Sequence, residues 1–301
     1  MKVRAAALAA VWLCAAVSAV GQDLLARAQS LVRDGKLDEA LPLIQRFLKE
    51  RPASAEAHAV LGFIFFRQSK PSEALREYSE AAKYRKPTAF ESKIAGLSHA
   101  MLEDYSSADR DLTRALELNP KDLQTCNYLG EVRFLRERYE ETVAAFRHCL
   151  TLDARNVFAQ NGIGSAFEQM QRLDDAAAAY RKAIEWQPAE SIYDPTPVLN
   201  LGRVLLKQNR SEEALPYLTR AVELAPDHAG SHEQLSKAHS RVNDLDAARR
   251  EVEKAIELKP DDYRLHYVLG RLFQNAGMRD KAQREFEIYR ALKKRTEDPR
   301  P

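Results

Sequence analysis

Apolar residues recur along this chain at intervals of three and four, which is the period of an α-helix. Segments 201–206 and 214–222 show the pattern clearly, and a polar stretch separates them. Similar pairs of segments follow one another along the chain. A single pair of short helices cannot bury its apolar face, whereas stacked neighbours can. The pattern therefore predicts a series of helix pairs that pack on one another.

The pairs repeat with a period of 34 residues. We number each unit so that its recurrent small residue is position 8: Ala28, Gly62, Gly96, Gly130, Gly164, Gly202, Ser236 and Gly270. Position 20 again holds a small residue: Ala40, Ala74, Ala108, Thr142, Ala176, Ala214, Ala248 and Ala282. Position 24 holds a large apolar residue: Ile44, Tyr78, Leu112, Phe146, Tyr180, Leu218, Val252 and Phe286. Most units close on a proline: Pro52, Pro120, Pro188, Pro226 and Pro260.

These positions have simple structural roles. Small residues at positions 8 and 20 allow the two helices of a unit to approach closely, and the proline stops the second helix before the next unit. Eight such units, one insertion at 191–194 and short terminal segments account for all 301 residues.

The pattern of small, aromatic, small and proline positions, as in Gly164, Tyr180, Ala183 and Pro188, resembles the tetratricopeptide repeat. The resemblance covers residues 22–296. It implies an all-α fold, a right-handed superhelical solenoid of about eight antiparallel helix pairs, whose first helices line a concave groove. It also implies a function, because the family consists chiefly of protein-interaction scaffolds.

The ends of the repeat array and its insertion carry separate predictions. Most inner repeats have a leucine, isoleucine or valine at position 28, but the eighth repeat has Arg290, a polar residue of the kind that a capping repeat needs. Residues 297–301 are predicted to be a solvated tail. Asp194, followed by Pro195, is a natural helix start. The insertion is either a tolerated loop or a surface that presents Ile192 and Tyr193 to a partner.

The first 21 residues have the features of a signal peptide. Lys2 and Arg4 precede an apolar run from Ala5 to Val17, and small residues follow at 18–21. We therefore expect an exported protein, secreted or periplasmic, without stable membrane insertion after cleavage. The alternative is an N-terminal membrane anchor, although the run is shorter than the ~20 residues that span a bilayer.

The charge balance limits the kinds of partner. The chain has 46 Lys and Arg against 44 Asp and Glu, and loss of Lys2 and Arg4 would leave 44 of each. Nucleic-acid binding depends on an excess of basic residues that neutralise phosphates, so we expect no nucleic-acid partner. A mean hydropathy of -0.48 with 45% hydrophobic residues excludes both a disordered chain and a membrane bundle.

No catalytic or cofactor motif stands out in the sequence. It lacks a glycine-rich phosphate loop, a His-Glu-x-x-His motif and paired Cys-x-x-Cys motifs. His58, His232 and His266 share repeat position 4, which normally faces the partner helix, so a metal site is not expected there. The sequence therefore predicts a protein that is not an enzyme and that needs no cofactor or metal.

By the resemblance, positions 2, 5, 6, 9, 12 and 13 of each first helix face the groove. In the N-terminal half these are mainly aromatic, in the C-terminal half mainly basic, with asparagines between. An extended peptide with apolar anchors at one end and acidic residues at the other would suit such a wall. Alternatively, the aromatic residues pack between repeats and the basic residues only increase solubility. The predicted groove residues are Phe63, Phe66, Phe90, Asn127, Tyr128, Phe134, Phe158, Asn161, Asn200, Arg203, Lys207, Lys237, Arg241 and Arg271.

Cys126 and Cys149 occupy positions 4 and 27 of one repeat. In an antiparallel helix pair these positions face each other, so an oxidising compartment could close a disulfide there. The alternative is a pair of buried thiols, because helix axes usually pack 8 to 10 Å apart.

Two functions remain open from the sequence. The first is an exported, non-catalytic scaffold that binds a protein or peptide segment in the concave groove. The second is an envelope assembly factor that engages a large complex or polysaccharide machinery through its convex face and its insertion. The oligomeric state is not determined by the sequence.

Overall fold

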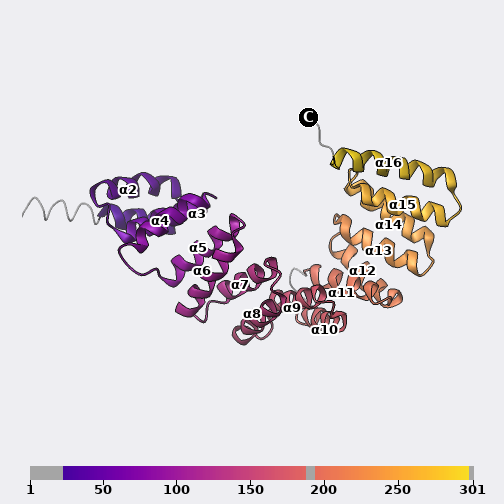
Figure 1. Cartoon of the computed structure of the whole chain (residues 1–301), viewed down its shortest axis with the longest axis horizontal. Coiled ribbons are helices and arrows are strands. Elements are labelled where there is room, and N and C mark those ends of the chain that lie inside the picture. The colour runs from indigo at the N-terminus through magenta and orange to yellow at the C-terminus, as the bar shows by residue number, and fades with distance from the viewer. Residues whose placement is uncertain (1–22, 188–193, 298–301) are drawn as a thin grey trace, which may run out of the picture. The chain divides into compact units, whose positions relative to one another are not determined.

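The computed structural model describes residues 23–187 and 194–297, and every regular element within these ranges is an α-helix (Figure 1). The predicted signal peptide, residues 191–193 of the insertion and residues 298–301 of the tail lie outside the described residues. The first helix covers residues 23–33. It is followed by α2 (Leu37–Glu50), α3 (Ala55–Arg67), α4 (Pro71–Ala82), α5 (Ala89–Met101), α6 (Tyr105–Leu118), α7 (Leu123–Leu135), α8 (Tyr139–Leu152), α9 (Val157–Gln169), α10 (Leu173–Glu185), α11 (Thr196–Lys207), α12 (Ser211–Leu224), α13 (Ala229–Arg241), α14 (Leu245–Leu258), α15 (Tyr263–Asn275) and α16 (Arg279–Glu297).

The helices belong to two compact units. The N-terminal unit extends to Arg138 and contains the helices up to α7, whereas the C-terminal unit begins at Tyr139 and contains α8 to α16. In each unit the helices follow the chain as consecutive pairs, such as α3 with α4 and α15 with α16 (Figure 1). The predicted all-α fold of stacked helix pairs is confirmed.

The two helices of a pair touch where the sequence alternates small and large residues. A Cβ atom added at Gly164 would lie 2.5 Å from the ring of Tyr180, and one added at Gly202 would lie 2.5 Å from the Cδ2 atom of Leu218. Real side chains do not pack so closely, so position 8 must remain small when position 24 is large. This contact explains the strongest periodicity of the sequence.

A left-handed backbone turn joins the two helices of each pair at repeat position 15. Glycine occupies this position at Gly35 and Gly277, with φ of 76° and 75°. Six other repeats place a larger residue there at φ between 58° and 64°: Ser69, Glu103, Glu137, Gln171, Asn209 and Asn243. A left-handed conformation costs about 1–2 kcal/mol for a residue with a Cβ atom, so packing of the flanking helices must hold these turns.

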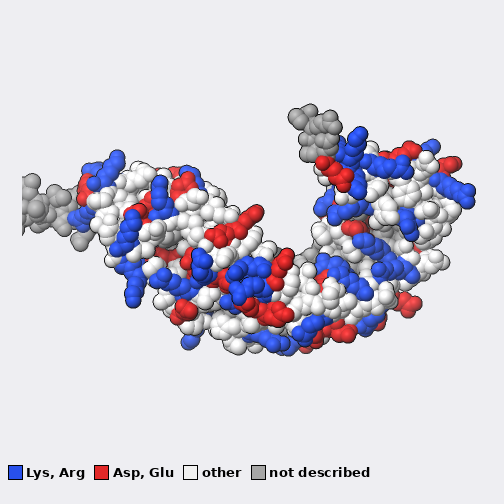
Figure 2. Space-filling model, viewed as in Figure 1, with Lys and Arg blue, Asp and Glu red and all other residues white. Residues whose placement is uncertain are grey.

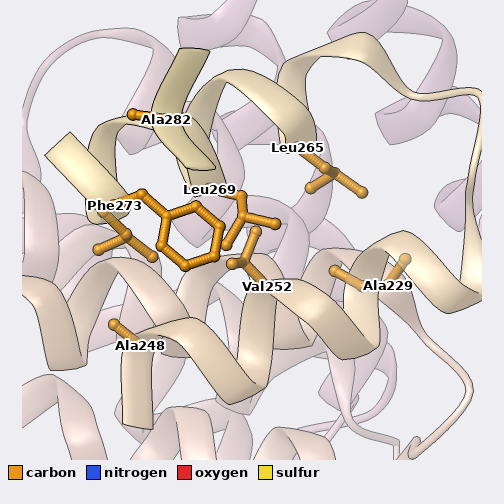
Figure 3. Packing of buried hydrophobic residues seen from close by; sticks show 9 residues of the cluster. Ala229, Ala248, Val252, Leu265, Leu269, Phe273 and Ala282 are labelled. Atoms are coloured by element: carbon orange, nitrogen blue, oxygen red, sulfur yellow. The ribbon is translucent and has the colours of Figure 1, made fainter. Parts of the chain in front are cut away.

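Consecutive repeats share a common apolar junction. Val252 and Ala255, at positions 24 and 27 of the seventh repeat, pack against Leu265, Leu269 and Leu272 of the next first helix (Figure 3). The junction between the first two repeats uses the same positions, with Ile44 and Phe47 against Ala57, Leu61 and Ile64. Positions 3, 7 and 10 of each new repeat therefore cover positions 24 and 27 of the preceding one.

The ends of several elements differ in detail from the sequence prediction. The last helix, α16, continues through Glu297, so this residue is helical although it was expected in the tail. Proline is absent until Pro299, and Lys293 pairs with Glu297 one turn later at 3.7 Å, which supports the extra turn. Asp194 acts as predicted at the start of α11, because its carboxylate accepts a hydrogen bond from the backbone N–H of Thr196 at 2.9 Å.

Candidate functional site

The first helices of three consecutive repeats line an open cleft in the N-terminal unit. The helix at 23–33, α3 and α5 surround a volume of about 610 Å³, and we call this space the N-terminal cleft. Its size falls in the range of ordinary ligand pockets. First helices were expected to form the binding wall, and here three of them line an open cleft.

An aromatic pair dominates the apolar surface of the cleft. The ring centroids of Phe63 and Phe90 lie 5.4 Å apart at an interplanar angle of 52°. Phe90 is 52% exposed, although the side chain is large and apolar. Phe63 is half-buried beside it. Exposed aromatic surface in a concave site provides binding free energy when a ligand removes it from water.

Basic side chains border the aromatic pair. The guanidinium of Arg67 lies 5.8 Å from the centroid of the Phe63 ring, within the range of a cation–π contact. Arg33 is exposed on the first helix of the cleft. Glu56 is the exposed acidic residue of the lining. The cleft thus combines apolar surface with at least two accessible guanidinium groups.

One acidic residue of the cleft is already neutralised inside the protein. Glu91 is buried and accepts hydrogen bonds from both terminal nitrogens of Arg85, at 2.8 and 2.5 Å. It also closes a capping box at the start of α5, where its carboxylate accepts the backbone N–H of Thr88. Burial acts to raise the pKa of Glu91, but the hydrogen bonds from Arg85 and Thr88 outweigh it and keep this pKa below its ordinary value.

The other predicted groove residues of the N-terminal unit do not join the cleft lining. Phe66 packs against the core residues Ala74 and Ile94. Tyr128 packs against Leu112 and Leu129, and its hydroxyl accepts a hydrogen bond from Gln124 at 3.1 Å. Asn127 and Phe134 are half-buried on α7. Packing between repeats, the alternative considered for the aromatic residues, therefore accounts for Phe66 and Tyr128.

In the C-terminal unit, two cations of the predicted basic wall are compensated by a buried carboxylate. Glu168, on α9, is only 3% exposed and receives Arg203 at 2.9 Å and Lys207 at 2.8 Å, both from α11. The hydroxyl of Tyr180 donates a third hydrogen bond to the same carboxylate at 3.0 Å. Burial acts to raise the pKa of Glu168, but its two basic partners outweigh burial and hold the pKa below its ordinary value. We call these four residues the Glu168 network.

Other predicted residues of this unit also have partners in the protein. The side chain of Asn200 donates to Asn161 at 3.1 Å, so these two amides bind each other. Lys237 pairs with Glu233 at 2.7 Å on the same helix. Arg241 donates to the backbone carbonyl of Leu206.

Two predicted residues of the C-terminal unit have more accessible side chains. Phe158 is 46% exposed and packs edge-on against Phe146, with 5.9 Å between centroids. Arg271 is exposed and forms no ion pair with any residue in the described ranges.

Two functional residues were not predicted from the sequence: Glu168, which neutralises two cations, and Arg33, which lines the N-terminal cleft. Glu168 stands at position 12, one of the predicted groove positions, but acidic residues are so frequent in this chain that it did not stand out. Arg33, at position 13 of its repeat, was overlooked although that position was predicted to face the groove. Comparing charges at groove positions between consecutive repeats would have found both.

The three histidines at position 4 perform the same structural role. His58, His232 and His266 each place Nδ1 within 2.8 Å of a glutamate in the second helix of their repeat. In each ring Nε2 lies 2.9 to 3.2 Å from the carbonyl of the proline that closes the preceding repeat. They therefore tie consecutive repeats together. Within the described residues, no group of three His, Cys, Asp or Glu side chains could hold a metal ion.

Cys126 and Cys149 are both buried. Their pairing remains a prediction, and counting the thiols of denatured, unreduced protein tests it. A closed loop of this length would contribute about 3 kcal/mol to stability by its effect on chain entropy. Two titratable thiols would contradict the disulfide.

No helix in the described ranges combines the length and the apolar content that crossing a bilayer requires.

Two stretches of the chain match known protein families. Residues 3–238 match the family described as Cilia and flagella-associated protein 70 C-terminal domain, and residues 233–295 match the tetratricopeptide repeat. Together these matches extend over almost the whole chain.

Proteins of distant organisms are similar to parts of this chain. Anaphase-promoting complex subunit 3 of Schizosaccharomyces pombe is 23% identical over 215 residues, which is 70% of this chain and 32% of that protein. Hsc70-interacting protein 1 of Drosophila melanogaster is 31% identical over 110 residues, 36% of this chain and 29% of that protein. The chain thus spans about a third of the length of these relatives. A tetratricopeptide repeat protein of Parabacteroides merdae has a similar fold, with a TM-score of 0.60 at 17% identity over 84% of this chain and 98% of that one.

Proposed function

Because this chain belongs to the tetratricopeptide repeat family, we propose that it is an exported, non-catalytic scaffold that binds a segment of another protein in its N-terminal cleft. The name of one relative, Hsc70-interacting protein 1, describes a protein partner, and the matched stretch of that relative consists of about a third of its length. A scaffold function needs a surface, and the cleft is the surface on which this proposal depends.

The observation that carries the proposal is the exposed aromatic pair in the cleft. Phe90 remains half exposed beside Phe63 although both have apolar neighbours. Full burial of one such ring is worth roughly 1.5 to 3 kcal/mol. An apolar or aromatic side chain of a bound segment, packed on the exposed side of these rings, would bury much of this surface. Such an anchor would be the energetic centre of the interface.

The charges of the cleft indicate what surrounds that anchor. Arg85 is neutralised by Glu91, whereas Arg33 and Arg67 lie at the cleft with exposed side chains. Acidic residues flanking the anchor would pair with these two arginines. The acidic part of the ligand is thus assigned to the same cleft as its apolar part, because Arg203 and Lys207 of the C-terminal wall are already bound to Glu168.

Site-specific photocrosslinking tests this proposal. A photoreactive phenylalanine analogue is placed at Phe90 in the cleft, at the exposed Arg46 on the second helix α2, and at Tyr193 in the insertion. We expect a crosslinked partner from position 90 and none from position 46, and the crosslink at 90 should be lost in Phe63→Ala.

A partner crosslinked from position 193 but not from position 90 would contradict the proposal. That result would instead favour an assembly factor that acts through its insertion. Export is tested separately by N-terminal sequencing, which should find the chain beginning near Gln22, and retention of Met1 in a membrane fraction would contradict it.

A further inference from the structure

Helices α15 and α16 carry an aromatic surface that the other described residues of the C-terminal unit cover only in part. Tyr289 of α16 packs against Tyr263 and Tyr267 of α15, with ring centroids 5.9 and 5.3 Å apart. Tyr267 also contacts Phe286 at 5.9 Å. Tyr267 is 44% exposed. We call these four residues the end face.

The end face differs from the same surface in every earlier repeat. Positions 24 and 27 of the first seven repeats are at most 7% exposed. In the eighth repeat these positions hold Phe286 and Tyr289, which are only half-buried. Position 27 is alanine in five of the seven earlier repeats. Tyr289 therefore has a much larger apolar side chain than most residues at this position. Arg290 was predicted to cap this repeat, but it makes only one position of the surface polar.

The inner junctions show what kind of element covers these positions. In each, a first helix supplies residues at positions 3, 7 and 10, which is an i, i+4, i+7 stripe on one helical face. The junction most similar to the end face is the first, because Phe47 there is also an aromatic residue at position 27. It is covered by a small residue followed by two branched ones, Ala57, Leu61 and Ile64.

The positive charge around the end face favours a covering helix that carries acidic residues beside its apolar stripe. Arg290, Lys293 and Lys294 line a cavity of about 350 Å³ beside Tyr289, together with Glu297. Figure 2 shows Lys and Arg side chains gathered over α16. The ammonium group of Lys293 lies 5.9 Å from the centroid of the Tyr289 ring. A covering helix with acidic residues beside its apolar stripe would complement these cations.

A second copy of this chain does not fit the end face. The helix at 23–33, the first in the described residues, carries Asp23, Arg27 and Ser30 at positions 3, 7 and 10, so it lacks the apolar stripe. Two end faces packed on each other would bring Arg290, Lys293 and Lys294 of both copies together. Such juxtaposition of like charges is unfavourable.

We propose that the end face docks an acidic amphipathic helix of a partner protein, which occupies the place that a following first helix would take. The small residue of its i, i+4, i+7 stripe lies against Tyr289. This surface belongs to the C-terminal unit, so the inference is independent of the N-terminal cleft.

A synthetic peptide copying residues 54–68 is a suitable probe, because this sequence covers Phe47 at the first junction. Replacing Phe63 and Phe66 by Glu in the peptide removes two residues that do not belong to the stripe and makes the peptide acidic. A control peptide also carries Leu61→Ser and Ile64→Ser. Each fluorescently labelled peptide is titrated with the full chain, and binding is followed by anisotropy.

We expect the acidic peptide to bind at least tenfold more tightly than its serine control. Tyr289→Ser should weaken binding at least tenfold, and Lys293→Glu with Lys294→Glu severalfold at low salt. Leu118→Ser, which replaces a similarly exposed apolar residue of α6 outside both surfaces, is the control and should leave binding unchanged. Circular dichroism of each variant checks that the helices are intact, and the charge reversal leaves the aromatic packing in place.

Three results would overturn the proposal. Equal binding of the two peptides, including no binding of either, would show that the stripe is not recognised. Binding only after removal of residues 298–301 would identify the chain's own tail as the occupant. Concentration-dependent association of the wild-type chain in sedimentation, lost in Tyr289→Ser, would identify a second copy.

Discussion

The first helices of the two units differ in whether their groove side chains are accessible to a ligand or are paired within the protein. In the N-terminal unit, Phe90 is exposed and Arg67 lies over Phe63, so apolar surface and positive charge face the cleft. In the C-terminal unit, Arg203 and Lys207 extend from α11 to a buried carboxylate on α9. The first wall presents exposed arginines to a ligand, whereas Arg203 and Lys207 of the second wall are already paired with Glu168 and leave Arg271 as its exposed cation.

This difference shows that a basic residue at a groove position is not by itself a binding residue. Glu168 precedes Arg203 by 35 residues and Lys207 by 39, which is about one repeat including the insertion. The counter-ion therefore comes from the neighbouring repeat. Whether a cation can bind a ligand depends on the residue that the preceding repeat places beside it.

The largest expected effect comes from removing the carboxylate of the C-terminal wall. Glu168→Ala should lower the free energy of unfolding of the C-terminal unit by about 3 kcal/mol, because it leaves two partly buried cations without their acceptor. Trp186 is the one tryptophan outside residues 1–22, so its fluorescence in a denaturant titration reports on this unit. Glu56→Ala, which removes an exposed acid from the N-terminal cleft, should change stability by less than about 0.5 kcal/mol. Equal effects of the two substitutions would remove the distinction between the walls.

The next effect concerns binding at the open wall. Phe90→Ala should weaken binding of the crosslinked partner about tenfold, or about 1.4 kcal/mol, because half of the ring is available to be buried by a ligand. Phe158→Ala is the matched control, since Phe158 is a similarly exposed aromatic residue on the C-terminal wall. Isothermal titration of the two variants measures both affinities. If Phe158→Ala weakened binding as much as Phe90→Ala, the C-terminal wall would also contact the ligand.

A smaller effect should appear on acidification. Glu168 has a lowered pKa in the folded protein, so the unfolded chain takes up this proton at a higher pH than the folded one. Its stabilisation is complete above the unfolded pKa of about 4.3 and is lost as pH falls through the folded pKa. Denaturation monitored by Trp186 between pH 7 and pH 3 should therefore show a steeper loss in the wild-type chain than in Glu168→Gln. Parallel curves would mean that the network does not contribute to acid sensitivity.

The smallest effect is expected from the accessible arginines of the cleft. Arg67→Gln should weaken partner binding two- to threefold at low ionic strength and hardly at all at high salt, because exposed charges are screened by salt. Titrations at about 20 and about 500 mM salt check this. Arg203→Gln, which removes a cation already bound to Glu168, should not alter the salt dependence of binding. A change equal to that of Arg67→Gln would show that Arg203 is available to the ligand.

Several features of the site could be predicted from the sequence. Repeat numbering located Phe63 and Phe90 on first helices, and both line the cleft. The same numbering also predicted Phe66 and Tyr128 as groove residues, although their rings pack against core residues of their own unit. Helical periodicity identifies the face of a residue, but the depth of packing on that face depends on the sizes of its neighbours in adjacent repeats.

The sequence by itself determined the helix pairs, their period and the close contact of positions 8 and 24, because these follow from local periodicity and from residue size within one repeat. Only the tertiary structure decided that Glu168 neutralises Arg203 and Lys207, that Arg85 is bound by Glu91 and that Tyr289 is only half-buried. These outcomes depend on pairs of side chains from different helices, and the Coulomb and packing energies of such pairs depend on distances that a one-dimensional pattern does not contain.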